Sequence, residues 1–149
     1  MPTIFRSAVG AKVIIAADDH CPPHVHVWHR GEEWVVRMTF SFIDQRTNVL
    51  TIVPSEGEVS QRQLNTLAEE IAAHLPACRA IWWKLRGTTC LENQKVLMRP
   101  SGGYALTTDE RPDAKRIALA TYDTAEQALA MRFWGGGAAT MPVGEGAIS

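Results

Sequence analysis

The chain is organised around residues 18–29, which run Asp18-Asp19-His20-Cys21-Pro22-Pro23-His24-Val25-His26-Val27-Trp28-His29. Four of the five histidines lie in this stretch, together with two carboxylates and a thiol. Pro22 and Pro23 fix their own φ angles and force the residues before them out of the helical region, which predicts a stiff, extended loop over 18–23. Residues 24–27 then alternate histidine and valine, a pattern typical of a half-buried strand.

A second alternating run begins at Trp34 and ends at Phe40, and a turn around Arg30-Gly31 would join the two runs as a hairpin. We expect a register that gives both valines apolar partners, because residues two apart on a strand share a face and a one-residue slip would expose them. The expected pairs are Val27–Trp34 and Val25–Val36 on the apolar face, and His26–Val35, His24–Arg37 and Trp28–Glu33 on the polar face.

The pattern as a whole predicts an α+β fold, with residues 1–85 forming a small, mainly antiparallel sheet that has one main helix packed on one face. Further strands are expected over 13–15 and 48–53. Ser60 and Gln63 form a capping-box pattern that begins a helix over 61–75, and Pro76 interrupts that helix or begins a short turn over 78–85. The expected shared core comprises Val25, Val27, Trp34, Val36, Leu64, Leu67, Ile71 and Leu75.

Residues 86–149 form a C-terminal extension, which we expect to pack on the first part. A second hairpin is predicted over 95–106 and a strand over 116–122. Asp123 and Glu126 have the spacing of a helix cap, so a short helix is expected to follow, with Ala125, Leu129 and Phe133 directed inward. The glycines at 135–137 would end this helix and leave a loose tail to the C-terminus.

Composition narrows the range of function classes. The 149 residues carry a formal net charge of −1, so there is no bulk attraction to nucleic acid or to an anionic membrane, and any nucleic-acid binding would have to be local. The longest aliphatic run, Val13–Ala17, is too short to span a bilayer. Met1–Arg6 lacks the features of a signal peptide, and the three cysteines contain no Cys-x-x-Cys pair of the kind found in zinc ribbons. We expect a cytoplasmic protein without membrane association.

Two motifs resemble the bacterial domain-of-unknown-function family 4160. They are the start Met1-Pro2-Thr3-Ile4 and the signature Asp19-His20-Cys21-Pro22-Pro23-His24-Val25-His26, and the likeness continues through His74 and Trp82 on the helix. The resemblance covers residues 1–85. This chain departs from the family pattern in a longer segment over 41–53, in Pro76, and in everything after Arg86. Members of the family often lie beside another small gene in arrangements like those of toxin–antitoxin or mobile-element modules, which implies a protein partner.

The residues therefore suggest first a partner-binding module, whose functional surface is the face formed by His24, His26 and Arg37. Trp28 and Trp34 would suit such a surface, because aromatic residues dominate interface hot spots. The remaining candidate binding residues come from the same stretch and are Asp19, His20 and His29. Histidines beside aspartates are also frequently hydrogen-bonded structural groups, and this alternative stays open.

Two chemical alternatives use the same face. In a metal-independent nuclease or phosphate-binding protein, His24 and His26 would act as base and acid while the Arg37 guanidinium holds the phosphate. In a metal site, His24 and His26 would bind zinc, iron or manganese, with Asp19, His20 or His74 as the third ligand. A nearby Arg37 opposes metal binding in that alternative. No nucleophile motif or phosphate-binding glycine loop supports a different enzyme class.

Overall fold

The computed structural model describes residues 3–54 and 59–144, which form two compact units. Unit 1 comprises residues up to Ser41 together with 45–87, and unit 2 comprises Phe42–Asp44 together with the chain from Thr88 onward. Met1 and Pro2 of the family-like start, and the last five residues of the expected tail, lie outside the described residues. The fold is mixed α+β, but each unit contains its own five-stranded sheet, so the protein is richer in sheet than expected.

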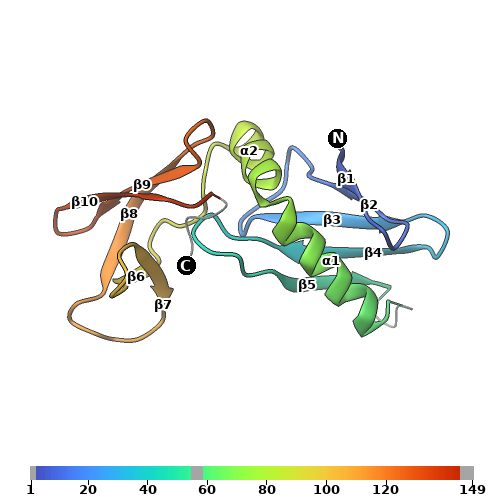
Figure 1. The fold of residues 1–149 in the computed structure, drawn as a ribbon, viewed down its shortest axis with the longest axis horizontal. Helices are drawn as coiled ribbons and strands as arrows, with labels where there is room; N and C mark the ends of the chain where they lie inside the picture. Colours follow the sequence, from blue (N-terminus) through green and yellow to red (C-terminus); the bar gives the residue numbers. More distant parts are fainter. Residues whose placement is uncertain (1–2, 55–58, 145–149) are drawn as a thin grey trace. The chain divides into compact units, whose positions relative to one another are not determined.

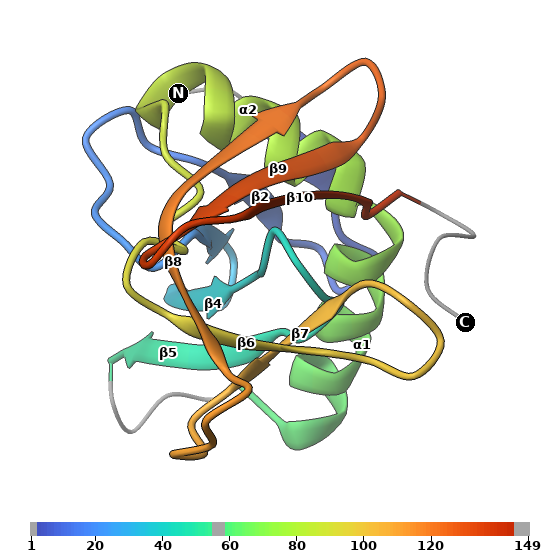
Figure 2. The same cartoon turned by 90° about the vertical axis from the view of Figure 1, so that its left-hand side faces the viewer.

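Unit 1 is an antiparallel sheet whose strands follow one another in chain order (Figure 1). Each strand pairs with the next along the chain, and two helices, α1 and α2, lie across one face of the sheet (Figures 1 and 2). The strands are β1 Thr3–Arg6, β2 Lys12–Ile14, β3 His24–His29, β4 Trp34–Thr39 and β5 Asn48–Val53, and the helices are α1 Gln61–Ala73 and α2 Leu75–Arg86.

The β3–β4 hairpin forms, but its register differs from the expected one by two residues. Val27 pairs with Val36 and His26 pairs with Arg37, whereas Val27–Trp34 and His24–Arg37 were predicted. The difference comes from the length of the turn. Arg-Gly is a poor two-residue turn, and the chain instead turns over the four residues 30–33, of which the last, Glu33, has φ +57°. A shift by two keeps every side chain on its expected face, since the side-chain period of a strand is two.

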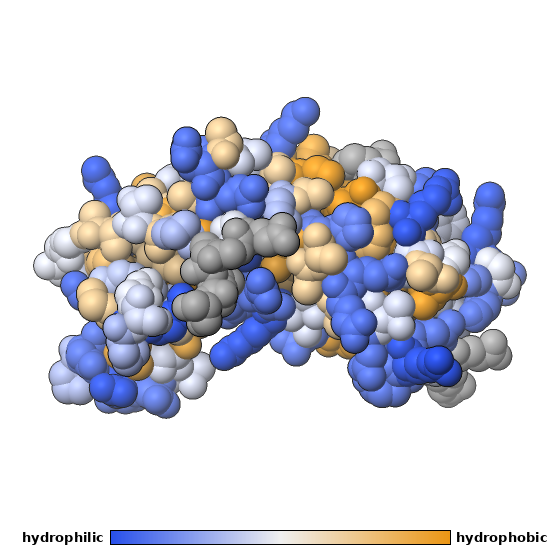
Figure 3. All heavy atoms as spheres, in the orientation of Figure 1, coloured by the Kyte–Doolittle hydropathy of each residue, from blue (hydrophilic) through white to orange (hydrophobic). Residues whose placement is uncertain are grey.

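The apolar face of this sheet and the helices share one core. Val25, Val27, Trp34 and Val36 are all buried, as predicted, and Trp34 is therefore not available as a docking residue. From the helices, Leu67, Ile71 and Leu75 are buried, while Leu64 is half-buried. On the outer side of the layer that α1 forms in unit 1, hydrophilic and apolar side chains lie side by side (Figure 3).

The helical segment contains two helices rather than one. The capping box forms as predicted, because the Ser60 hydroxyl accepts from the Gln63 N–H and the Gln63 side chain accepts from the Ser60 N–H. His74 ends α1 and precedes α2, whose first turn contains Pro76. Proline suits a first helical turn because that turn has no use for its missing N–H. None of the helices within the described residues is long and apolar enough to cross a membrane.

Unit 2 is a second antiparallel sheet with the strand order β10-β9-β8-β6-β7. The predicted hairpin and strand are present, but the expected helix over 123–133 is wrong. Leu129, Met131 and Phe133 are buried in alternation with less buried neighbours, which is a strand pattern, and the Asp123 carboxylate accepts from the Glu126 N–H inside the hairpin turn. The strands are β6 Lys95–Met98, β7 Tyr104–Thr107, β8 Lys115–Asp123, β9 Ala128–Phe133 and β10 Ala138–Pro142.

The tail after Phe133 was also predicted wrongly as loose. The three glycines at 135–137 all have positive φ angles and turn the chain sharply, so that β10 pairs with β9 along its whole length. Glycine populates this region readily because it has no Cβ. A glycine run after an alternating segment therefore indicated a hairpin, not the end of a helix.

Candidate functional site

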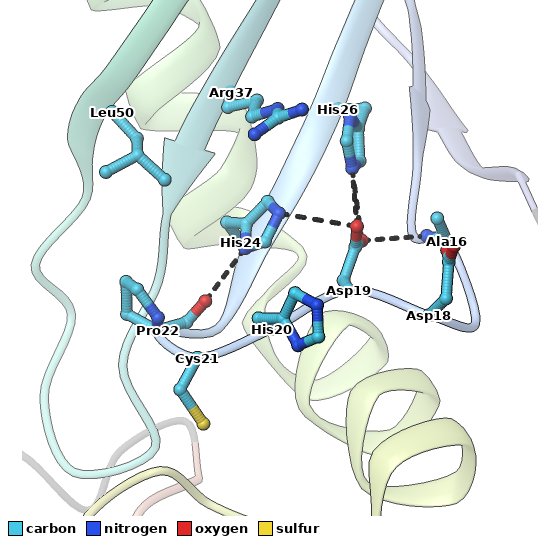
Figure 4. A pocket seen from close by; sticks show the side chains of 10 residues that line it. All are labelled: Ala16, Asp18, Asp19, His20, Cys21, Pro22, His24, His26, Arg37 and Leu50. Atoms are coloured by element: carbon cyan, nitrogen blue, oxygen red, sulfur yellow. Dashed lines mark hydrogen bonds and ion pairs between the residues drawn. The ribbon is translucent and has the colours of Figure 1, made fainter.

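The candidate site is a pocket of about 410 Å³ in unit 1, beside the start of β3. The loop over 16–22 forms one wall, β3 contributes His24 and His26, and β4 and β5 contribute Arg37 and Leu50 (Figure 4). The two histidines project on the same side because they are two residues apart on a strand, opposite the buried Val25 and Val27. The local alternation in the sequence therefore determines which face carries the site.

Asp19 is the centre of this pocket, with its carboxylate directed at both imidazole rings (Figure 4). Its Oδ1 atom lies 2.9 Å from Nε2 of His26 and 3.5 Å from Nε2 of His24. Its Oδ2 atom accepts a hydrogen bond of 3.0 Å from the Ala16 N–H, which fixes the carboxylate in the loop. Asp19 is 9% exposed and His24 is 5% exposed, so this is a largely buried charged and polar cluster.

The hydrogen bonding of His24 determines which of its nitrogens is directed at Asp19. Nδ1 lies 2.8 Å from the carbonyl oxygen of Pro22. A carbonyl only accepts, so Nδ1 carries the hydrogen, and in the neutral ring Nε2 then presents a lone pair. That lone pair faces the Asp19 carboxylate at 3.5 Å, and two acceptors facing each other require a proton or a metal ion between them.

The ring of His26 is oriented by Asp19 and lies beside that of His24. The two ring centroids are 5.2 Å apart and their planes are tilted by 55°. His24 also lies against the buried Trp82 of α2, at a centroid distance of 5.6 Å. The carbonyl of Pro22 and the ring of Trp82 thus restrict the orientation of His24, which is the kind of support that a functional imidazole requires.

Arg37 lines the pocket from β4 and is paired across the strands with His26. Its side chain is exposed, and its guanidinium makes no hydrogen bond or ion pair within residues 3–54 and 59–144. His20 also lines the pocket and is exposed. Sequence reasoning therefore identified the residue types at this site, but assigned Arg37 to the wrong histidine.

The other predicted site residues lie elsewhere in unit 1. Trp28 is 44% exposed near the far end of β3 and lies under the Arg30 guanidinium, 5.9 Å from the ring centroid. His29 accepts a hydrogen bond from the Glu32 N–H in the hairpin turn. His74 stacks on Phe5 at a centroid distance of 4.0 Å and is not one of the pocket residues, so the alternative that made it a metal ligand is not supported.

The arrangement can hold a metal ion. One donor atom from each of Asp19, His24 and His26 lies within 4.8 Å of the other two, and no other group of three such donors was found within the described residues. Bonds of about 2.0–2.1 Å in tetrahedral geometry place ligand atoms roughly 3.4 Å apart. The separations of 2.9 and 3.5 Å between Asp19 Oδ1 and the two Nε2 atoms bracket that value.

Comparison with known proteins adds no further assignment, so the resemblance to family 4160 stays an expectation based on the signature. No family model, no curated protein and no solved structure matches this chain.

Proposed function

We propose that this protein binds a divalent transition-metal ion through Asp19, His24 and His26, and that the open coordination positions of the ion face the pocket. Two imidazoles and one carboxylate form a ligand set typical of zinc hydrolases and of non-haem iron enzymes, both of which keep positions free for water or substrate. The metal alternative thereby takes precedence over the partner-binding module that the sequence first suggested.

One observation carries this proposal, namely that His24 donates from Nδ1 to a backbone carbonyl and directs Nε2 at a carboxylate. Metal-binding histidines almost always donate their second ring nitrogen in this way, since the hydrogen bond fixes the tautomer and orients the ring. A cation between Nε2 and the Asp19 carboxylate would satisfy both acceptors. The Ala16 N–H, which holds the other carboxylate oxygen, belongs to the same supporting shell.

The two other functions receive less support from this geometry. An acid–base pair needs imidazole nitrogens that reach a substrate, but Nε2 of both rings is directed at Asp19 and His24 is buried. A docking face would have used Trp28 and Trp34 together, yet Trp34 is only 1% exposed.

The test is metal binding by the full chain. Protein purified without chelator is analysed for metal content, and stripped protein is titrated with zinc against a chromophoric chelator. We expect one ion per chain, and a loss of affinity of at least about 100-fold in Asp19→Asn, His24→Gln and His26→Gln, since loss of even an outer-shell partner costs roughly 10–100-fold.

His74→Gln is the matched control, because it removes a histidine that lies outside the pocket. It should bind zinc like the wild type. Equal zinc affinity in the wild type and the three ligand variants, or no zinc binding by the wild type, would contradict the proposal.

A further inference from the structure

The guanidinium of Arg37 is a cation that the proposed metal site does not need. It lines the same pocket as the three ligands and is exposed, and no hydrogen bond or ion pair engages it within the described part of the chain. The strand pairing keeps it there, because Arg37 is opposite His26 on β3 and opposite Thr51 on β5. Its position is therefore set by two neighbouring strands and not by a charged partner.

The charges in the pocket are unbalanced once a metal ion is bound. A divalent ion and Arg37 would bring three positive charges to this face. The two carboxylates that line the pocket, the ligand Asp19 and the exposed Asp18, bring two negative charges, so one positive charge is left over. Like charges in one site repel each other, and an anion that lies between them removes this cost. The guanidinium also presents a planar fork of donors that matches the oxygens of a phosphate or carboxylate.

We propose that the pocket binds a small molecule through an oxyanion group, with one oxygen on the metal ion and the others on Arg37. This inference rests on the metal site proposed above. A pocket of about 410 Å³ is in the range of small-molecule sites and is larger than a bare phosphate requires, and Leu50 offers an apolar surface for the organic part. A phosphate ester and a carboxylate share the required chemistry, and the experiment distinguishes them.

The experiment uses the full chain with Co²⁺ in the site, because the visible absorption of Co²⁺ reports changes in its ligands. Co²⁺ affinity is measured first for the wild type and Arg37→Gln. Each loaded protein is then titrated separately with inorganic phosphate and with acetate. We expect a saturable spectral change in the wild type, and at least 10-fold weaker anion binding in Arg37→Gln with Co²⁺ affinity retained or increased. The anion that saturates at the lower concentration identifies the preferred group.

Arg30→Gln is the matched control, because Arg30 is an exposed arginine in the hairpin turn and does not line the pocket. It should behave like the wild type in both titrations. Co²⁺ binding without any anion-dependent spectral change, or with equal anion affinity in Arg37→Gln, would overturn the oxyanion site while leaving the metal site intact. Failure to bind Co²⁺ would overturn both.

Discussion

Replacement of Asp19 should destabilise the protein by an amount that depends on zinc. In the metal-free protein the Asp19 carboxylate accepts from the Ala16 N–H and contacts His26 at 2.9 Å. Hydrogen bonds to charged groups contribute about 1.5–3 kcal/mol each, and their effects overlap at one carboxylate. We therefore expect Asp19→Ala to lower the free energy of unfolding by about 2–4 kcal/mol, and Asp19→Asn by about 1–2 kcal/mol because its amide oxygen can still accept from Ala16.

Zinc should widen the difference between wild type and variant. A ligand that binds only the folded state stabilises it by about 2.7 kcal/mol at a free concentration of 100 times Kd. Asp19→Asn lacks one metal ligand, so zinc should stabilise it by only a small part of this ~2.7 kcal/mol. The difference in free energy of unfolding between wild type and Asp19→Asn should therefore grow from about 1–2 to roughly 4 kcal/mol on addition of zinc.

The assay is urea unfolding followed by tryptophan fluorescence, with chelator or with buffered zinc. Four of the five tryptophans belong to unit 1, so the signal mainly reports unfolding of the unit that carries the site. The reasoning would be refuted if the wild type and Asp19→Asn differed by the same free energy with and without zinc. A variant at an exposed carboxylate of unit 2, Asp109→Asn, should show neither effect.

Three further outcomes follow from the packing. Leu67→Ala should lower the free energy of unfolding by about 2–5 kcal/mol in the same urea assay, because its side chain is fully buried between α1 and the sheet. Burial raises the pKa of the Cys78 thiol to about 12, so the reactive thiolate is scarce in the folded state, and peptide mapping should show alkylation of Cys78 at pH 8 only as fast as the protein unfolds. Gly10→Ala should lower the stability in thermal unfolding more than Gly87→Ala does. Both glycines have positive φ, which costs an alanine about 1–2 kcal/mol. Only at Gly10 would the added Cβ also approach a side chain, because it would lie 3.1 Å from the His29 ring.

Short-range patterns predicted most of unit 1. Alternation at 24–27 and 34–38 placed the valines inward and the histidines on the other face, and the capping box predicted the start of α1. The register was wrong because it depends on the length of the turn, and the sequence 30–33 fits no favoured two-residue turn. A positive φ at Glu33 is a rare solution that residue preferences do not indicate.

Unit 2 was predicted less well because the spacing of its apolar residues fits both a helix and a strand. Leu129 and Phe133 are four residues apart, a separation that places side chains on one side of a helix and also on one side of a strand. Met131 between them is buried, which decides for the strand. The Asp123–Glu126 contact occurs in turns as well as at helix starts, since it needs only a local carboxylate and a free N–H.

The choice of Asp19 over His74 as the third donor shows where sequence reasoning reaches its limit at the site. Both were candidates, and the resemblance to family 4160 favoured neither. Asp19 precedes the two prolines by only a few residues, so the stiff loop returns its carboxylate to the start of β3, where Ala16 holds it. His74 depends instead on how α1 crosses the sheet, and its ring stacks on Phe5 of β1. The sequence could name the loop residues Asp19 and His20 as candidate donors but could not choose between them, and a donor on a packed helix such as His74 requires the tertiary structure.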